Sequence, residues 1–246
     1  MGYGIYLYGI FPEPGPEGLQ VKGLDNQPVK VKLWHGFAFL HSEAQQERYL
    51  ASRRNLLGHE KVLEEAMQHG YRTLLPLQFG LIVDAWETVT QHLILPYGDK
   101  LQQLFLKLEG KREVGIKVFW DATAELNQLI EENGELKAKR DSLQGKPLGI
   151  EQVISIGQEI EREMQQRQRK IIEVFQKTLN PLAVEVVENE RLTEAMIYNA
   201  SYLIAWDEEE KFAAHLENLD RYFESRLRIR YNNFTAPYNF AQLSYL

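Results

Sequence analysis

His59 and Glu60 are the first residues whose types and spacing could do chemistry. A zinc-protease helix carries the sequence His-Glu-x-x-His, in which two His bind the metal and the Glu activates a water molecule. Here Leu63 stands where the second His is required. The segment therefore predicts an ordinary helix and no metal site.

No other segment matches a catalytic or cofactor signature. The glycines before residue 10 fit neither the dinucleotide nor the phosphate-loop spacing, and no Gly-x-Ser-x-Gly segment offers a nucleophile. The six histidines lack the spacing of metal ligands: His35, His41, His59, His69, His92 and His215. We therefore expect no cofactor, no metal and no enzymatic activity. The alternative, a cytosolic small-molecule enzyme, would require His35, His59 and Asp121 to converge on one cleft.

The composition is typical of a globular protein of the cytosol. A chain of 246 residues, 44% of them apolar, can build one large domain or two ordinary ones. The absence of Cys fits a reducing compartment. The net charge of −7 argues against nucleic acid as the main partner. No stretch approaches the roughly 20 apolar residues that cross a membrane. A signal peptide would require basic residues near its start, and no Lys or Arg precedes Lys22.

The long charged stretch at residues 122–179 predicts two helices packed along their length. Two sets of residues recur at alternating three- and four-residue steps, the pattern of a coiled-coil seam. The first set is Leu126, Leu129, Leu136 and Leu143, with Asn133 and Arg140 filling the gaps between them, and the second is Val153, Ile156, Ile160, Met164, Arg167, Ile171 and Val174. Between the two sets, the Gly/Pro-rich residues 145–149 break the helix. We therefore expect a long antiparallel coiled-coil hairpin.

Apolar alternation and turn residues divide the rest of the chain into strands and helices. The expected strands are residues 3–11, 34–41, 73–83, 113–121, 183–187, 195–206 and 226–231. The expected helices outside the hairpin are residues 42–67, capped by Ser42, residues 88–106, divided near Pro96, and a helix that Asp207 caps.

The order of these elements predicts the fold class. From Val114 onward it is strand, helical hairpin, strand, strand, helix, strand, which is the split βαββαβ order of a ferredoxin-like unit with its first helix grown into a hairpin. The charged residues 107–112 before it mark a boundary. The prediction is therefore an α+β protein with an N-terminal α+β domain at residues 1–107 and a C-terminal ferredoxin-like domain at residues 108–246.

The strand at residues 73–83 is the first candidate for binding a partner. It contains Pro76, which lacks a backbone donor, so it should lie at the edge of its sheet. Leu77 and Phe79 should then face the core, while Gln78 points outward to a partner that adds a strand. The alternative is that this strand only completes its own core.

Two further groups of residues are candidates for partner contacts. Arg167 and Arg169 lie in the one basic patch of the hairpin, although such charged runs are usually solvated, salt-bridged helix faces. Tyr238 and Phe240 belong to an aromatic tail. Aromatic residues anchor interfaces when they are exposed, and otherwise pack on their own domain.

Several segments, in order along nearly the whole chain, are similar to one known family. They are residues 6–10 (Tyr-Leu-Tyr-Gly-Ile), 54–63 (Arg-Asn-Leu-Leu-Gly-His-Glu-Lys-Val-Leu), 69–70 (His-Gly), 74–80 (Leu-Leu-Pro-Leu-Gln-Phe-Gly), 199–204 (Asn-Ala-Ser-Tyr-Leu-Ile) and 236–240 (Ala-Pro-Tyr-Asn-Phe). Together they resemble the gas vesicle protein F/L family, in which a His-Glu-x-Val segment leads into a Leu-Pro-Leu-x-Phe-Gly strand. The chain departs from that family at its end, where the Trp- and Pro-rich form common in relatives is reduced to one Pro and no Trp.

The resemblance implies an accessory protein of gas vesicle formation, which would be a minor structural component or an assembly factor in the cytoplasm and at the gas vesicle. The implied partners are the small, very apolar shell protein and other gas vesicle accessory proteins. Shell subunits would expose apolar surface and strand edges before assembly, and such surfaces aggregate unless they are covered. The enzyme described above and a tether in which the hairpin self-associates are the alternatives.

Overall fold

The computed structural model describes residues 2–143, 149–224 and 226–243, which form two compact units. The first unit contains the residues up to Val114, together with Leu203–Asp207 and the tail from Asn232. The second unit contains Gly115–Tyr202 and Glu208–Tyr231. The predicted domain boundary at residue 107 stays a prediction.

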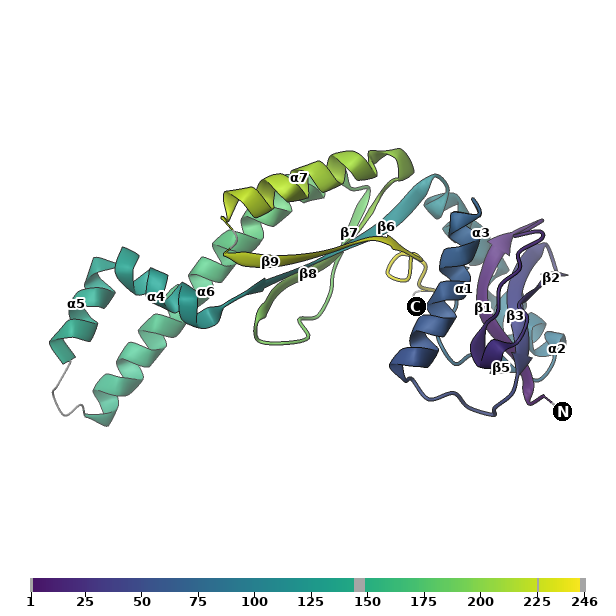
Figure 1. Ribbon diagram of the computed structural model, residues 1–246, viewed down its shortest axis with the longest axis horizontal. Coiled ribbons are helices and arrows are strands. Elements are labelled where there is room, and N and C mark those ends of the chain that lie inside the picture. The colour runs from purple at the N-terminus through teal and green to yellow at the C-terminus, as the bar shows by residue number, and fades with distance from the viewer. Residues whose placement is uncertain (1, 144–148, 225, 244–246) are drawn as a thin grey trace. The chain divides into compact units, whose positions relative to one another are not determined.

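The first unit is built on a five-stranded sheet in the order β2-β3-β1-β4, with β5 also paired to β1 (Figure 1). The strands are β1 (Gly4–Pro12), β2 (Lys30–Trp34), β3 (Phe37–Ala44), β4 (Leu75–Pro76) and β5 (Ile82–Val83). All of their pairings are antiparallel, and a 3₁₀ turn, η1 (Leu24–Asn26), lies between β1 and β2 along the chain. The strand predicted at residues 3–11 is confirmed as β1, and three other strands pair with it.

Helix α1 (Arg53–Gln68) approaches β1 closely. At Gly9 in β1, a Cβ atom would lie only 2.7 Å from Cδ2 of Leu63 in the helix. A larger residue at this crossing would therefore have to displace the Leu63 side chain. The core of the unit forms where α1 meets the sheet, and it includes Tyr6, Tyr8, Phe11, Leu40, Val62, Leu63, Ala66 and Leu74.

The prediction that this helix begins at Ser42 is wrong. Strand β3 continues through Ala44, and the hydroxyl of the buried Ser42 lies 2.9 Å from the Tyr8 hydroxyl. The helix begins instead after Ser52, whose Oγ accepts the backbone N–H of Asn55 at 3.3 Å. Both serines suit a helix cap locally, and only the pairing of β3 with β1 decides between them.

The prediction of one continuous strand over residues 73–83 is also wrong. The segment forms two short strands, β4 and β5, joined by residues 77–81, which we call the 77–81 loop. Pro76 supplies no N–H, and Gly80 adopts a φ of 88°, which strand residues avoid. Strand β4 ends the strand order of its sheet, so the predicted edge position of Pro76 is confirmed.

The helix expected over residues 88–106 continues through Pro96 instead of dividing there. It consists of α2 (Trp86–Val89), a wider π-helical turn η2 (Thr90–Ile94) and α3 (Leu95–Leu108). Proline cannot donate a hydrogen bond to the carbonyl four residues earlier, and its ring collides with that carbonyl in a regular α-helix. The wider turn immediately before Pro96 accommodates this residue without ending the helix.

The second sheet has the strand order β7-β8-β6-β9. Its strands are β6 (Lys111–Trp120), β7 (Glu185–Glu188), β8 (Met196–Ala205) and β9 (Leu227–Thr235). Short 3₁₀ turns, η3 (Asn180–Leu182) and η4 (Trp206–Glu208), lie before β7 and after β8. Helix α7 (Glu209–Tyr222) follows η4, so the prediction that Asp207 is its N-cap is wrong, and Glu208 holds that position without a side-chain hydrogen bond.

The helical arm consists of three helices: α4 (Ala122–Glu132), α5 (Gly134–Leu143) and α6 (Ile150–Leu179) (Figure 1). The first half of the predicted hairpin is therefore not one continuous helix. Asn133 is extended (φ −100°, ψ 96°) and ends α4, while its side chain accepts the N–H groups that open α5. The break predicted at residues 145–149 falls mostly on residues 144–148, which lie outside the described residues.

The predicted seam of the arm is covered only in part. Leu129, Leu136 and Ile171 are buried as expected, whereas Val153 is 53% exposed. At the start of α4, Glu125 is buried and the neighbouring Leu126 is only half-buried. Glu125 therefore takes the inner position that was predicted for Leu126. The coiled-coil description of the whole arm stays a prediction.

Candidate functional site

The 77–81 loop carries three of the predicted partner-binding residues, and hydrogen bonds fix it to the first unit. The N–H of Leu77 donates to the carbonyl of Tyr8 at 3.0 Å. The N–H of Gly80 donates to the hydroxyl of Tyr6 at 2.9 Å. The loop is thus held firmly although it has left the strand conformation, because its backbone groups find partners on β1.

His59 completes this support from the inner face of α1, where it is 2% exposed. Its Nε2 lies 3.1 Å from the carbonyl of Leu77, which can only accept, so Nε2 carries the ring proton. The other ring nitrogen, Nδ1, lies 2.9 Å from the Tyr6 hydroxyl and therefore accepts its proton. One chain of hydrogen bonds thus runs from Gly80 through Tyr6 and His59 to Leu77.

The titratable groups of this network all have pKa values far from neutrality. Burial lowers the pKa of His59 to about 4, although the hydrogen bond to the Leu77 carbonyl opposes the shift. Burial raises the pKa of the Tyr6 and Tyr8 hydroxyls, and it raises that of Tyr49 to about 12. These groups keep one protonation state around pH 7, which suits a rigid support better than acid–base chemistry.

The side chains of the loop divide between the core and the solvent. Phe79 is half-buried, with its ring centroid 5.9 Å from that of His59 and 6.4 Å from that of Tyr6. Leu77 is half-buried, Gln78 is exposed, and Leu81 is 36% exposed. The greater burial of Leu77 and Phe79 than of Gln78 is consistent with their inward and outward assignment, while contact of Gln78 with a partner stays a prediction.

The aromatic tail is anchored to the first unit. Tyr238 packs against the core and Phe240 is 2% exposed, so neither ring is freely available. Between them, Asn239 donates from its backbone and its side chain to the buried carboxylate of Glu113 at 2.9 and 2.6 Å. The tail residues thus have a structural role here, and their contact with a partner stays a prediction.

Arg167 belongs to a cluster of charges at the base of the arm. Its Nε lies 2.6 Å from the carboxylate of Glu125 and its NH1 lies 2.7 Å from that of Glu132. Arg226, which lies just before β9, also contacts Glu125, at 2.8 and 3.0 Å. Burial alone would raise the pKa of Glu125, but the hydrogen bonds from Arg226 and Arg167 outweigh it and hold the pKa below its usual range.

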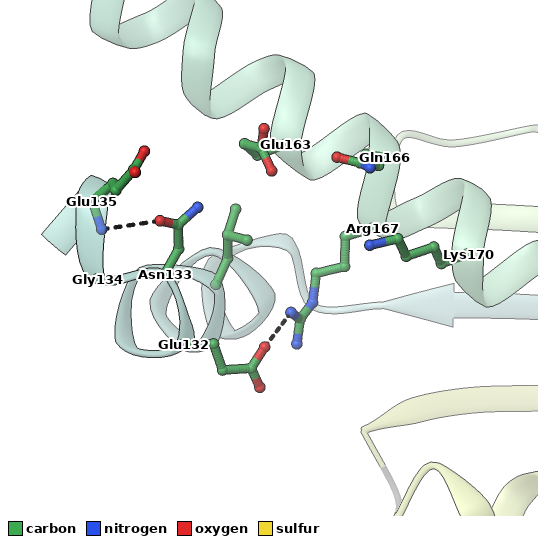
Figure 2. A pocket seen from close by; sticks show the side chains of 9 residues that line it. Glu132, Asn133, Gly134, Glu135, Glu163, Gln166, Arg167 and Lys170 are labelled. Carbon is green, nitrogen blue, oxygen red and sulfur yellow. Dashed lines mark hydrogen bonds and ion pairs between the residues drawn. The ribbon is translucent and has the colours of Figure 1, made fainter.

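The break at Asn133 leaves a hollow between α4, α5 and α6 (Figure 2). The guanidinium of Arg167 points toward Glu132, and Asn133 turns toward the start of α5 (Figure 2). The hollow is lined by Leu129, Glu132, Asn133, Gly134, Glu135, Glu163, Gln166, Arg167 and Lys170. Arg169 does not line it but is exposed elsewhere on α6, so the structure separates the two predicted arginines.

Sequence reasoning missed the Glu125 cluster and the Tyr6–His59 contact. One signal was available for the first of them: Arg167 occupies a seam position, and a charge in a seam requires an opposite charge on the facing helix. The partners lie far apart along the chain, since Glu125 and Arg226 are separated by 101 residues and Tyr6 and His59 by 53.

The residues that an enzyme would need have separate structural roles. His35 occupies an exposed turn with a positive φ, His59 supports the 77–81 loop, and the Asp121 side chain caps α4. In the described part of the chain, no group of three or more acidic or His side chains is placed to hold a metal ion. None of the described helices is long and apolar enough to cross a membrane.

Comparison with known proteins gives consistent matches over the whole chain. Residues 4–242 match the family described as gas vesicle synthesis protein GvpL/GvpF. The chain is 56% identical to gas vesicle protein F of Nostoc sp. over 99% of this chain and 100% of that one, and 22% identical to that of Haloferax mediterranei over 99% and 95%. It is similar to the crystal structures of GvpF from Anabaena sp. (53% identity, TM-score 0.87, covering 98% and 97%) and Microcystis aeruginosa (54%, 0.85, covering 98% and 100%).

Proposed function

Because the chain belongs to the gas vesicle synthesis protein GvpL/GvpF family, as its sequence segments predicted, we propose that it is an accessory protein that supports gas vesicle formation by binding the small apolar shell protein. The family match over residues 4–242 carries this proposal. The protein acts in the cytoplasm and at the gas vesicle, as a minor structural component or an assembly factor. Its other partners are further gas vesicle proteins.

The physical task of such a protein is to cover surfaces that would otherwise aggregate. Unassembled shell subunits expose apolar side chains and unpaired strand edges. A partner that offers a fixed, partly apolar surface can cover such apolar side chains.

We propose the 77–81 loop as the docking site for the shell protein. Within the loop, Leu77 and Phe79 are half-buried, whereas Gln78 and Leu81 lie at the surface. The loop is held by Tyr6 and His59, so little conformational entropy is lost when a partner binds. A preorganised, partly apolar surface of this kind supports binding without any catalytic group.

We also propose that the protein is not an enzyme and that its second unit is ferredoxin-like. The separate roles of His35, His59 and Asp121 support the first statement. The strand order β7-β8-β6-β9, with helices after the first and third strands along the chain, supports the second. The domain division at residues 1–107 and 108–246 belongs to the same proposal.

A co-purification experiment tests the docking site. The tagged protein is produced together with shell protein, as wild type, as Gln78→Lys and as the control Gln103→Lys, which adds the same charge at an exposed position of α3. We expect Gln78→Lys to recover roughly tenfold less shell protein, because the new ammonium must be desolvated at an apolar contact. The control should recover as much as wild type.

The melting temperatures of both variants should stay close to that of wild type, because both positions are exposed. Equal recovery of shell protein by all three proteins would move the docking site away from the 77–81 loop. No recovery even by wild type would contradict the proposed function itself.

A further inference from the structure

The sheet of the second unit has one face covered by helices and one that carries basic side chains. On the covered face, Phe212 of α7 packs on Tyr202 of β8 and stacks on Tyr231 of β9, with ring centroids 5.1 and 6.0 Å apart. Alternate residues of a strand point to opposite faces, so the even-numbered neighbours of Tyr231 turn away from α7. We call this opposite surface the basic face, and it consists of Lys117, Phe119, Arg228 and Arg230.

Phe119 lies beneath two arginines of the basic face. The guanidinium of Arg228 lies 4.5 Å from the centre of its ring and that of Arg230 lies 5.2 Å away. The ring is 7% exposed beneath them. A guanidinium held over an aromatic ring by a cation–π contact can still bind a carboxylate through two parallel hydrogen bonds.

Arg226, close to these arginines in sequence, has a carboxylate partner, whereas Arg228 and Arg230 have none among the described residues. Arg226 is engaged by the buried Glu125. Over the described residues, by contrast, no carboxylate lies within ion-pair distance of Arg228, Arg230 or Lys117. The basic face is therefore a local concentration of uncompensated positive charge on a chain whose net charge is −7.

The edge beside these arginines is suited to strand addition. Strand β9 ends the strand order of its sheet, with β6 as its neighbour within the described chain. On the opposite face of β9 from these arginines, a groove is lined by Ala213, Leu216, Glu217, Asp220 and Arg221 of α7 and by Ile229 and Tyr231 of β9. An added strand would thus find arginines on one face and an apolar groove on the other.

We propose that β9 binds an extended segment of a partner protein in which acidic residues alternate with apolar ones. Alternate residues of a strand lie about 6.6–6.8 Å apart on one face, so two carboxylates in such a segment can meet Arg228 and Arg230. The apolar residues between them enter the groove beside Leu216 and Ile229. If the segment bound with its acidic side chains in the groove, Glu217 and Asp220 would repel them. This repulsion selects the orientation in which the acidic side chains meet the arginines.

The charges of the chain favour an acidic protein segment over nucleic acid. A nucleic-acid site requires a broad basic surface that follows the phosphate backbone. Here the basic side chains are few, and the groove along the same strand is lined by the carboxylates of Glu217 and Asp220. The alternation of charged and apolar surface matches a strand and not a phosphate backbone.

Two synthetic peptides test the proposal on the wild-type protein. One alternates Glu and Val, and the other has the same composition with all Glu in one block and all Val in another. Fluorescence anisotropy measures their dissociation constants. We expect the alternating peptide to bind roughly tenfold more tightly than the block peptide, and its affinity to fall with added salt.

The double variant Arg228→Gln/Arg230→Gln should weaken binding of the alternating peptide by roughly tenfold or more. Arg162→Gln removes an exposed arginine of α6 and serves as the matched control, with unchanged binding expected. Equal affinity for the two peptides, no binding of the alternating peptide, or unchanged binding by the double variant would overturn the proposal.

The same double variant separates the proposed occupant from the alternatives. If wild type binds an oligonucleotide through Arg228 and Arg230, or self-associates through them in sedimentation experiments, the proposed occupant is wrong. Thermal melting shows whether the double variant is folded. If it is not, the comparison of the two peptides on wild type decides the question alone.

Discussion

The hydrogen-bond chain through His59 makes the stability of the first unit depend on pH. His59 is 2% exposed and accepts the proton of the Tyr6 hydroxyl on Nδ1, so protonation of this nitrogen would break the chain. Burial lowers the pKa of the folded His59 to about 4, from an ordinary value of 6.5. Between these two values the unfolded chain binds a proton that the folded protein excludes.

The sign and size of the effect follow from this difference. As the pH falls below 6.5, the unfolded state gains the proton first, so the free energy of unfolding decreases until the folded state is protonated near pH 4. At pH 5 the pH lies about 1.5 units below the ordinary His pKa of 6.5, and this difference corresponds to a loss of about 2 kcal/mol in the free energy of unfolding. Above pH 7 both states are neutral at His59, and its contribution to pH dependence disappears.

Denaturant unfolding at pH 7.5 and 5.0 measures this difference. Trp34, Trp86 and Trp206 belong to the first unit and Trp120 to the second, so tryptophan fluorescence reports mainly on the unfolding of the first unit. The variant His59→Gln cannot titrate at this position. We expect wild type to lose about 2 kcal/mol more than the variant between the two pH values.

His41 is the control for this experiment, since its pKa is also lowered to about 4, by burial and by the charges of Lys30 and Lys32. It is partly exposed, so solvent screening should leave it with a smaller contribution. His41→Gln should therefore retain most of the wild-type pH dependence. If wild type and His59→Gln lose the same free energy on acidification, the assignment of a neutral, accepting His59 is wrong.

Two further predictions concern the second unit. Glu125→Gln should lower the free energy of unfolding by about 3 kcal/mol, because it leaves two arginines without their buried countercharge, whereas Glu132→Gln, at a more exposed carboxylate, should cost less than about 1 kcal/mol. Equal effects of the two changes in denaturant unfolding would contradict this role for Glu125. Replacing residues 134–160 by a short Gly-rich link should leave the second unit folded. Removing residues 122–179 should unfold it, because Phe175 of α6 is fully buried and contacts Tyr198 of β8 and Phe223, which follows α7. Circular dichroism melting checks both deletions, and a cooperative transition after the longer one would show that the sheet does not need α6.

The sequence alone determined most of the local structure. Long apolar alternation predicted β1, β6 and β8. These predictions succeed because side-chain periodicity follows from strand and helix geometry alone. The family was also readable from short segments, since their order along the chain carries information that no single segment holds.

The tertiary structure alone decided how these elements begin, end and meet. Ser42 and Ser52 are equally good caps by type, and the pairing of β3 with β1 assigns only the second to the helix. The 77–81 loop does not continue the strand, and its backbone forms hydrogen bonds with the side chains of Tyr6 and His59 instead. The same holds for the charges: Arg226 reaches Glu125 across 101 residues of sequence. A pattern over neighbouring residues holds no information about contacts between residues that are far apart in the sequence. The hydrogen bonds that hold the 77–81 loop and the arrangement of the basic face therefore could not be derived from the sequence.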